Sequence, residues 1–199
     1  MRKFIFVLIW SILFTSGCNA QKNPNDLPDC NWCGAEEAPA NLTSYVTIAP
    51  ADEPGVRIAI KGKLYWSDGK TPAAGVIVYL YHTNAEGLYK KKGNETGNGR
   101  RHGYLRAWLK SSVDGSYEFE TIRPASYPNG TEAQHIHITV KPPGKEEIAL
   151  DSFMFDDDPL LTAERIKRLK QVGDSGSGIL SLKSADGRIV GYRDIVLPN

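Results

Sequence analysis

The sequence is poor in cysteine and histidine and has no excess of charge of either sign. Its 199 residues include three cysteines and four histidines, and 24 basic side chains nearly balance 23 acidic ones, for a net charge of +1. Proteins that bind nucleic acid usually carry a basic patch or stripe, whereas the charges here are well mixed along the chain. The composition therefore argues against nucleic acid as a partner.

An apolar run long enough to span a membrane, which needs about 20 residues, is also lacking. The apolar stretch that is present, residues 4–14, follows Arg2 and Lys3 and leads through small residues to Cys18. This is the pattern of a secretory signal, and a cysteine directly after small residues resembles a bacterial lipoprotein signal. We predict a signal over residues 1–18, a lipid on Cys18, and an exported, membrane-anchored lipoprotein on the periplasmic or cell-surface side. Cleavage without a lipid is the alternative.

The remaining cysteines, Cys30 and Cys33, form a single CxxC motif. No second CxxC completes a zinc site, and no βαβ pattern surrounds the motif as it would in a thioredoxin-like protein. In an exported protein the favoured interpretation is a small structural disulfide, with a redox or metal role left open. Residues 19–45 are polar and interrupted by prolines, which predicts a tether that carries the CxxC, ahead of a single domain over residues 46–199.

Helical periodicity is scarce. Only residues 161–172 read as a convincing helix, with Thr162 as its N-cap. Elsewhere short runs of β-forming residues alternate with turn clusters, which is typical of an all-β sandwich or barrel. We expect one hairpin with Asp114 and Gly115 at its tip and a second around residues 185–187.

Two of the four histidines, His135 and His137, stand two residues apart in a β-branched run. Residues i and i+2 of a strand point to the same face, so both imidazoles should project together. Tyr89 and Tyr127 lie in loops that follow strands, where side chains can converge. Neutral imidazole binds several transition metals, and a phenol is a good ligand only for a strongly Lewis-acidic cation such as Fe(III).

Four stretches, "YHTNAEGLY", "VDGSYEFETIRPASYP", "HIHITV" and "FMFDDDP", together resemble the intradiol ring-cleavage dioxygenases of the catechol and protocatechuate type. The resemblance implies a transthyretin-like (prealbumin-like) β-sandwich with one short helix near the C-terminus, and a non-haem Fe(III) ion held by Tyr89, Tyr127, His135 and His137. It implies that Tyr127 leaves the iron when substrate binds and so takes part in catalysis. The expected reaction opens the ring of a catechol with O2 between the two hydroxylated carbons, giving a muconate-type diacid.

One departure from the family concerns charge. Many members have an arginine shortly before the two histidines, and this sequence has Glu132 at the corresponding place. An acid in place of a base reverses the local electrostatics. The arginines at positions 100, 101, 106 and 123 are candidates to replace it, and the sequence does not place any of them in space. A transthyretin-like surface lipoprotein that binds a metal or ligand without turnover therefore stays open as the alternative, and the oligomeric state and the particular catechol stay open with it.

The other aromatic and histidine residues receive plainer interpretations. Tyr79, Tyr81, Tyr104 and Tyr117 are expected to pack within the fold. His82 and His102 are expected in surface loops.

Overall fold

The computed structural model describes residues 27–172 and 178–199. The predicted signal and Cys18 lie outside the described residues. In the part of the chain that is described, no helix is both long and apolar enough to cross a membrane.

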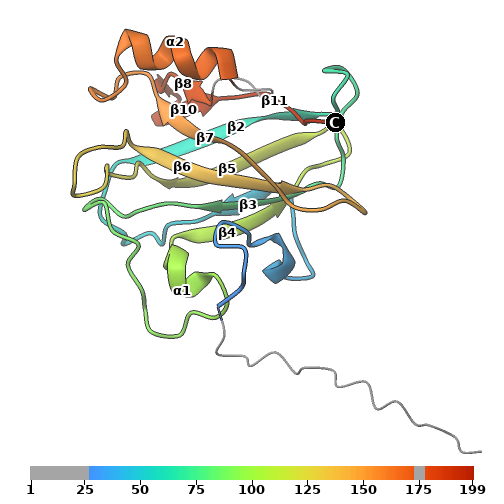
Figure 1. Ribbon diagram of the computed structural model, residues 1–199, viewed down its shortest axis with the longest axis horizontal. Helices are drawn as coiled ribbons and strands as arrows, with labels where there is room; N and C mark the ends of the chain where they lie inside the picture. Colours follow the sequence, from blue (N-terminus) through green and yellow to red (C-terminus); the bar gives the residue numbers. More distant parts are fainter. Residues whose placement is uncertain (1–26, 173–177) are drawn as a thin grey trace, which may run out of the picture.

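Two β-sheets form the body of the molecule (Figure 1), which confirms the predicted all-β sandwich. The first sheet has, in spatial order, the strands β1 (Tyr45–Thr47), β5 (Ser116–Ile122), β2 (Arg57–Tyr65), β10 (Arg188–Tyr192) and β9 (Lys183–Ala185), and β11 (Ile195–Val196) also pairs with β2. The second has the order β4 (Arg106–Lys110), β3 (Ile77–Tyr81), β6 (His135–Lys141), β7 (Ile148–Phe155) and β8 (Ile179–Leu180).

Alternation along the strands of the second sheet builds the core and leaves a polar and aromatic outer face. Val78 and Leu80 of β3, together with Ile136 and Ile138 of β6, belong to the buried apolar core. The residues between them point away from that core, because successive side chains of a strand face opposite ways. The outer face of β6 therefore carries its two histidines.

Helix α2 (Ala163–Val172) confirms the predicted helix and its cap, because the backbone N–H of Arg165 donates to the Thr162 hydroxyl. Two shorter elements were not expected from the sequence: η1 (Ala35–Glu37) and α1 (Gly99–His102). In Figure 1, α2 lies at the top of the view, far from α1 near the bottom.

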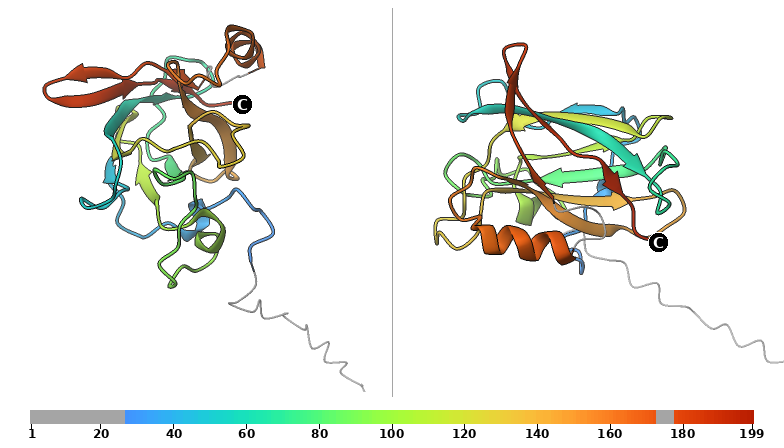
Figure 2. Two further views of the ribbon diagram at one scale, coloured as in Figure 1. Left: turned by 90° about the vertical axis from the view of Figure 1, so that its left-hand side faces the viewer. Right: turned by 90° about the horizontal axis from the view of Figure 1, so that it is seen from above.

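The hairpin predicted around Asp114 is wrong. Strand β4 pairs with β3 in one sheet, whereas β5 pairs with β2 and β1 in the other, so the turn carries the chain between the sheets. Turn residues fix a local reversal of the chain but not the partner of the strand that follows. The second predicted hairpin, β9–β10, is confirmed: Asp186 and Gly187 take positive φ values of 52° and 74°, as a type I′ turn requires. It projects from the body of the molecule in Figure 2.

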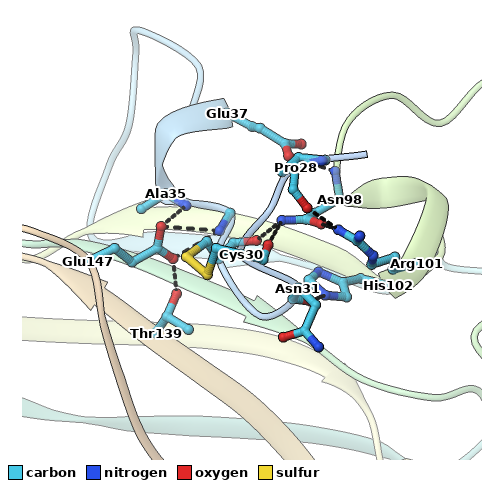
Figure 3. The surroundings of a disulfide bond; sticks show 12 residues. Pro28, Cys30, Asn31, Ala35, Glu37, Asn98, Arg101, His102, Thr139 and Glu147 are labelled. Carbon is cyan, nitrogen blue, oxygen red and sulfur yellow. Dashed lines mark hydrogen bonds between the residues drawn. A yellow bond between two sulfur atoms is a disulfide. The ribbon is translucent and has the colours of Figure 1, made fainter. Parts of the chain in front are cut away.

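Part of the segment predicted as a tether packs against the outer face of the second sheet. Cys30 and Cys33 form a disulfide there, as expected. The carboxylate of Glu147 accepts hydrogen bonds from the backbone N–H groups of Gly34 and Ala35 (Figure 3). The Trp108 indole donates to the Gly34 carbonyl. These contacts fix residues around the disulfide onto the sandwich.

The disulfide predicts a labelling result. In unfolded but unreduced protein, a thiol reagent should modify neither Cys30 nor Cys33, and after reduction it should modify both. Peptide-resolved mass spectrometry separates these two cysteines from Cys18. Full labelling of the pair before reduction would contradict the disulfide.

The tyrosines predicted to pack do so: Tyr79, Tyr81 and Tyr117 are buried, and Tyr104 packs against the core. The surface positions expected for the two histidines are wrong, since His82 is 1% exposed and His102 is 4% exposed.

His82 is buried at the end of β3, and both of its ring nitrogens have partners. Nδ1–H donates to the carbonyl of Thr83, and Nε2 accepts from the hydroxyl of Thr121, each at 2.7 Å. Thr121 belongs to β5, so a neutral imidazole links the two sheets. Burial lowers the pKa of His82 to about 4, because a charged ring would lose its hydration.

This pKa predicts a loss of stability in acid. The unfolded state has an ordinary histidine pKa of about 6.5 and binds a proton before the folded state does, so stability falls as the pH drops from about 6.5 to about 4. One histidine contributes a slope of at most about 1.4 kcal/mol per pH unit. Chemical denaturation of wild type and His82→Gln across this range should show a shallower slope in the variant, whatever its stability at pH 7. Equal slopes would show that His82 does not titrate in this way.

Candidate metal centre

Four polar side chains converge on one point at the outer face of β6. The hydroxyl of Tyr127 lies 2.8 Å from the hydroxyl of Tyr89, 3.1 Å from Nε2 of His135 and 3.3 Å from Nε2 of His137. The two Nε2 atoms are 3.1 Å apart, and Nε2 of His137 is 2.9 Å from the Tyr89 hydroxyl. The structure thus brings together all four residues that the sequence singles out.

Strand geometry provides the two nitrogens, and loops provide the two oxygens. Tyr89 ends a turn after β3 that the side chain of Asn84 organises, since its Oδ1 accepts from the backbone N–H groups of Glu86 and Leu88. Tyr127 lies in the loop between β5 and β6. The phenols therefore approach the imidazoles from two segments that are distant in sequence.

A register shift between β6 and β7 coincides with the site. Ile136 pairs with Phe153 and Ile138 with Leu150, so β7 has one residue more than β6 in the stretch that faces His137. Such β-bulges redirect side chains and are common beside active sites. Here the shift places the hydroxyl of Ser152 at 3.4 Å from Nδ1 of His137.

The imidazoles are oriented as electron-pair donors. Nδ1 of His135 lies 2.7 Å from the carbonyl oxygen of Ala133. A carbonyl only accepts, so Nδ1 carries the proton and Nε2 directs its lone pair at the cluster. Burial, together with the neighbouring His135, lowers the pKa of His137 to about 3, which keeps the His137 ring neutral. Burial and the hydrogen bond with Tyr127 raise the pKa of Tyr89.

Tyrosine is essential to any cation site here. Among the described residues, no group of three or more His, Cys, Asp or Glu side chains is placed to hold a metal ion. A phenol with a raised pKa gives up its proton only to a strongly Lewis-acidic cation. The donor set of two neutral imidazoles and two phenols therefore fits a hard trivalent ion better than zinc or calcium.

A cavity of about 360 Å³ opens beside the cluster, and its walls come from the loop before β6, from β6 and β7, and from α2. Its lining residues are Tyr127, Glu132, Ala133, His135, His137, Ser152, Met154, Arg165 and Leu169. Tyr127 faces this cavity, whereas Tyr89 is not among its lining residues. A small molecule that enters the cavity would thus meet Tyr127 and the two histidines.

Arg165 of α2 is the arginine that sequence reasoning missed. Its guanidinium lies 2.6 Å from the carboxylate of Glu132 and lines the cavity. Of the arginines considered from the sequence, Arg106 pairs with Glu37, Arg123 pairs with Asp157, and Arg101 donates to the Pro28 carbonyl. An acid at position 132 calls for a basic partner, but the sequence does not show that α2 folds back to provide it.

The chain is similar to known proteins in sequence and in fold. The sequence model of a family described as Dioxygenase matches residues 32–172, which is most of the chain. The chain belongs to the intradiol ring-cleavage dioxygenase family. It is 30% identical over 134 residues to catechol 1,2-dioxygenase 1 of Acinetobacter lwoffii, covering 59% of this chain and 42% of that protein. It is 28% identical over 118 residues to the protocatechuate 3,4-dioxygenase beta chain of Burkholderia cepacia, covering 56% and 50%. The chain thus spans about half the length of these relatives.

Solved structures share the fold. The dioxygenase domain of a dioxygenase–carbohydrate-binding fusion from Streptomyces sp. SirexAA-E superposes with a TM-score of 0.58 at 21% identity, covering 80% of this chain and 90% of that chain. Catechol 1,2-dioxygenase from Acinetobacter sp. ADP1 superposes with a TM-score of 0.60 at 17% identity, covering 81% and 59%. At these identities the likeness establishes the sandwich architecture.

Proposed function

We propose that this protein is an Fe(III)-dependent intradiol dioxygenase that opens the ring of a catechol with O2 to give a muconate-type diacid. The observation that carries the proposal is the convergence of Tyr89, Tyr127, His135 and His137, with neighbouring donor atoms 2.8–3.3 Å apart, beside a cavity. Membership of the intradiol family supports the same reaction class.

The four residues would hold the ion through two imidazole nitrogens and two phenol oxygens. The imidazoles would contribute no charge, so the phenols of Tyr89 and Tyr127, as phenolates, would compensate part of the charge of the ion. When bound, Fe(III) would supply the Lewis acidity that favours the deprotonated catechol and promotes its reaction with O2. Both oxygen atoms enter the product, so the reaction needs no added reductant.

The protein's own groups then bind and deprotonate the substrate. Tyr127 is the proposed catalytic residue, because its oxygen lies at the cavity and within hydrogen-bonding distance of both imidazoles. We propose that this oxygen takes one proton from the incoming catechol. Tyr89 has no place in the cavity wall and would remain a ligand. Ala133, Met154 and Leu169 provide apolar surface that suits an aromatic ring.

The ion pair of Glu132 and Arg165 is the charged part of the cavity wall. A catechol that has given one proton to Tyr127 is anionic, and a guanidinium nearby favours it, whereas an unpaired carboxylate would repel it. We infer that Arg165 offsets the unfavourable charge that Glu132 places near the site. The relatives named for catechol and protocatechuate make a catecholic ring the substrate class that we propose here.

We further propose that the protein acts outside the cytoplasm, held at the membrane by a lipid on Cys18. The N-terminal pattern motivates this, and the disulfide between Cys30 and Cys33 supports it, since disulfides persist mainly in oxidising compartments.

The ligand assignment predicts how variants bind iron. Iron-loaded wild type should be burgundy from tyrosinate-to-iron charge transfer. His135→Ala and His137→Ala should each lose at least 10–100-fold in iron affinity, because removal of a ligand costs no less than removal of its supporting contacts. Tyr127→Phe should keep iron but shift the colour and lose catechol-dependent oxygen uptake. Iron per chain, absorption and oxygen uptake are the measurements.

Tyr45→Phe is the matched control, because Tyr45 is an exposed tyrosine on β1 outside the cluster. It should leave iron, colour and turnover unchanged. Full iron occupancy in both histidine variants would show that the imidazoles do not hold the ion. A protein that binds iron as described but never consumes oxygen with any catechol would overturn the catalytic proposal.

The cavity charge predicts a binding effect. Arg165→Gln leaves Glu132 unpaired and should raise KM for a catechol about fivefold, which corresponds to the roughly 1 kcal/mol typical of a partly exposed charge pair. Glu132→Gln combined with Arg165→Gln should restore much of the loss. Arg168→Gln, on an exposed side of the same helix, is the control and should change nothing. An unchanged KM in Arg165→Gln would show that Arg165 does not assist catechol binding.

A further inference from the structure

The two histidines of the site are supported very differently. His135 donates from Nδ1 to a backbone carbonyl at 2.7 Å, which fixes the rotation of its ring. Nδ1 of His137 has the Ser152 hydroxyl at 3.4 Å, which is at the long limit of a hydrogen bond. Histidine ligands usually depend on a firm contact at the second nitrogen for their orientation. His137 therefore needs another support.

That support is a stack of aromatic rings. The ring of Tyr81, which pairs with His137 in the β3–β6 register, lies 4.4 Å from the His137 ring at an angle of 17°. Its opposite side faces the ring of His102 at 3.7 Å and 7°. Tyr81 is thus held between two imidazoles, and the stack restricts rotation of His137 about its Cβ–Cγ bond.

His102 is in turn fixed by hydrogen bonds at both nitrogens. Nε2–H donates to the backbone carbonyl of Asn31, and Nδ1 accepts from the hydroxyl of Tyr79, each at 2.7 Å. Burial lowers the pKa of His102, in keeping with a neutral ring that donates at one nitrogen and accepts at the other. The position of His102 thus depends on Asn31.

Asn31 lies in the turn that the Cys30–Cys33 disulfide closes, and hydrogen bonds hold this turn against the rest of the protein (Figure 3). The side-chain amide of buried Asn98 donates to the carbonyls of both cysteines, at 2.8 and 2.7 Å. Closure of the disulfide and these two bonds together fix the direction of the Asn31 carbonyl.

We propose that His102 and Tyr81 are positioning residues for His137, and that the disulfide-closed turn holds them in place through the Asn31 carbonyl. This rests on the proposed function in that His137 is taken as an iron ligand. The segment before the sandwich is then part of the support of the metal centre. The contacts run from Asn31 through His102 and Tyr81 to His137 without a gap.

The experiment compares variants that keep or remove each link. Tyr81→Leu removes the flat ring, and Tyr81→Phe keeps it as the matched control. His102→Phe keeps a ring against Tyr81 but loses the bond to Asn31. The double variant Cys30→Ser, Cys33→Ser removes the disulfide by mutation. Chemical reduction of the disulfide is avoided because the reductant would also reduce Fe(III).

Two readouts are used: the dissociation rate of iron into a chelator, and the His137 ring resonances by NMR in the metal-free protein. Tyr81→Leu, His102→Phe and the double serine variant should each release iron about tenfold faster, at the lower end of the cost of losing a ligand's support. Their His137 resonances should broaden or split. Tyr81→Phe should match wild type. Circular dichroism confirms that each variant is folded.

A combined variant tests the order of the contacts. If the turn acts through His102, the double serine change should have little further effect in a His102→Phe background, because the link is already cut. Additive effects would show that the turn does not act through His102, and unchanged rates and resonances in Tyr81→Leu would overturn the positioning role. If wild type fails to bind iron but the resonances respond as expected, the proposed function fails and the positioning of His137 stands.

Discussion

The site depends on one constraint of strand geometry: two residues separated by one other must point to the same side of a sheet. His135 and His137 are directed outward from β6 because Ile136 and Ile138 are needed in the core. Nothing in a sandwich covers an outer sheet face by default. The rest of the site consists of segments that cover this face, two of which bring tyrosine oxygens to the histidines.

Three separate segments provide that cover. The turn after β3 and the loop before β6 bring the phenols of Tyr89 and Tyr127, and α2 contributes Arg165 and Leu169 to the cavity wall. The disulfide-bearing segment covers the adjoining part of the same face, over β3 and β4. A row of aromatic rings connects the disulfide-bearing segment to the metal centre. The row runs across the outer face through Trp108, Tyr79, Tyr81 and His137, with centroid separations of 4.4–5.4 Å between successive rings.

The sequence predicts what local periodicity determines. Alternation along the strands indicates the sandwich and the shared direction of the two histidines, and a threonine cap marks the start of α2. Pairing between distant strands is not local, so the turn residues at Asp114 predict a hairpin, whereas the turn connects the two sheets.

The same limit applies around the site. Burial of His82 and His102 and the approach of Arg165 to Glu132 depend on segments far apart in the sequence. The positions of Tyr89 and Tyr127 in loops that follow strands suggest that they can reach the histidines, and their order along the chain strengthens this prediction because it resembles a known family.

The measurement that tests the central claim most directly is a crystal structure of the iron-loaded protein with anomalous differences collected at the iron absorption edge. We expect one strong anomalous peak among the Tyr89 and Tyr127 hydroxyls and the Nε2 atoms of His135 and His137. A peak bound elsewhere, or none at this cluster in protein that has been supplied with Fe(III), would contradict it.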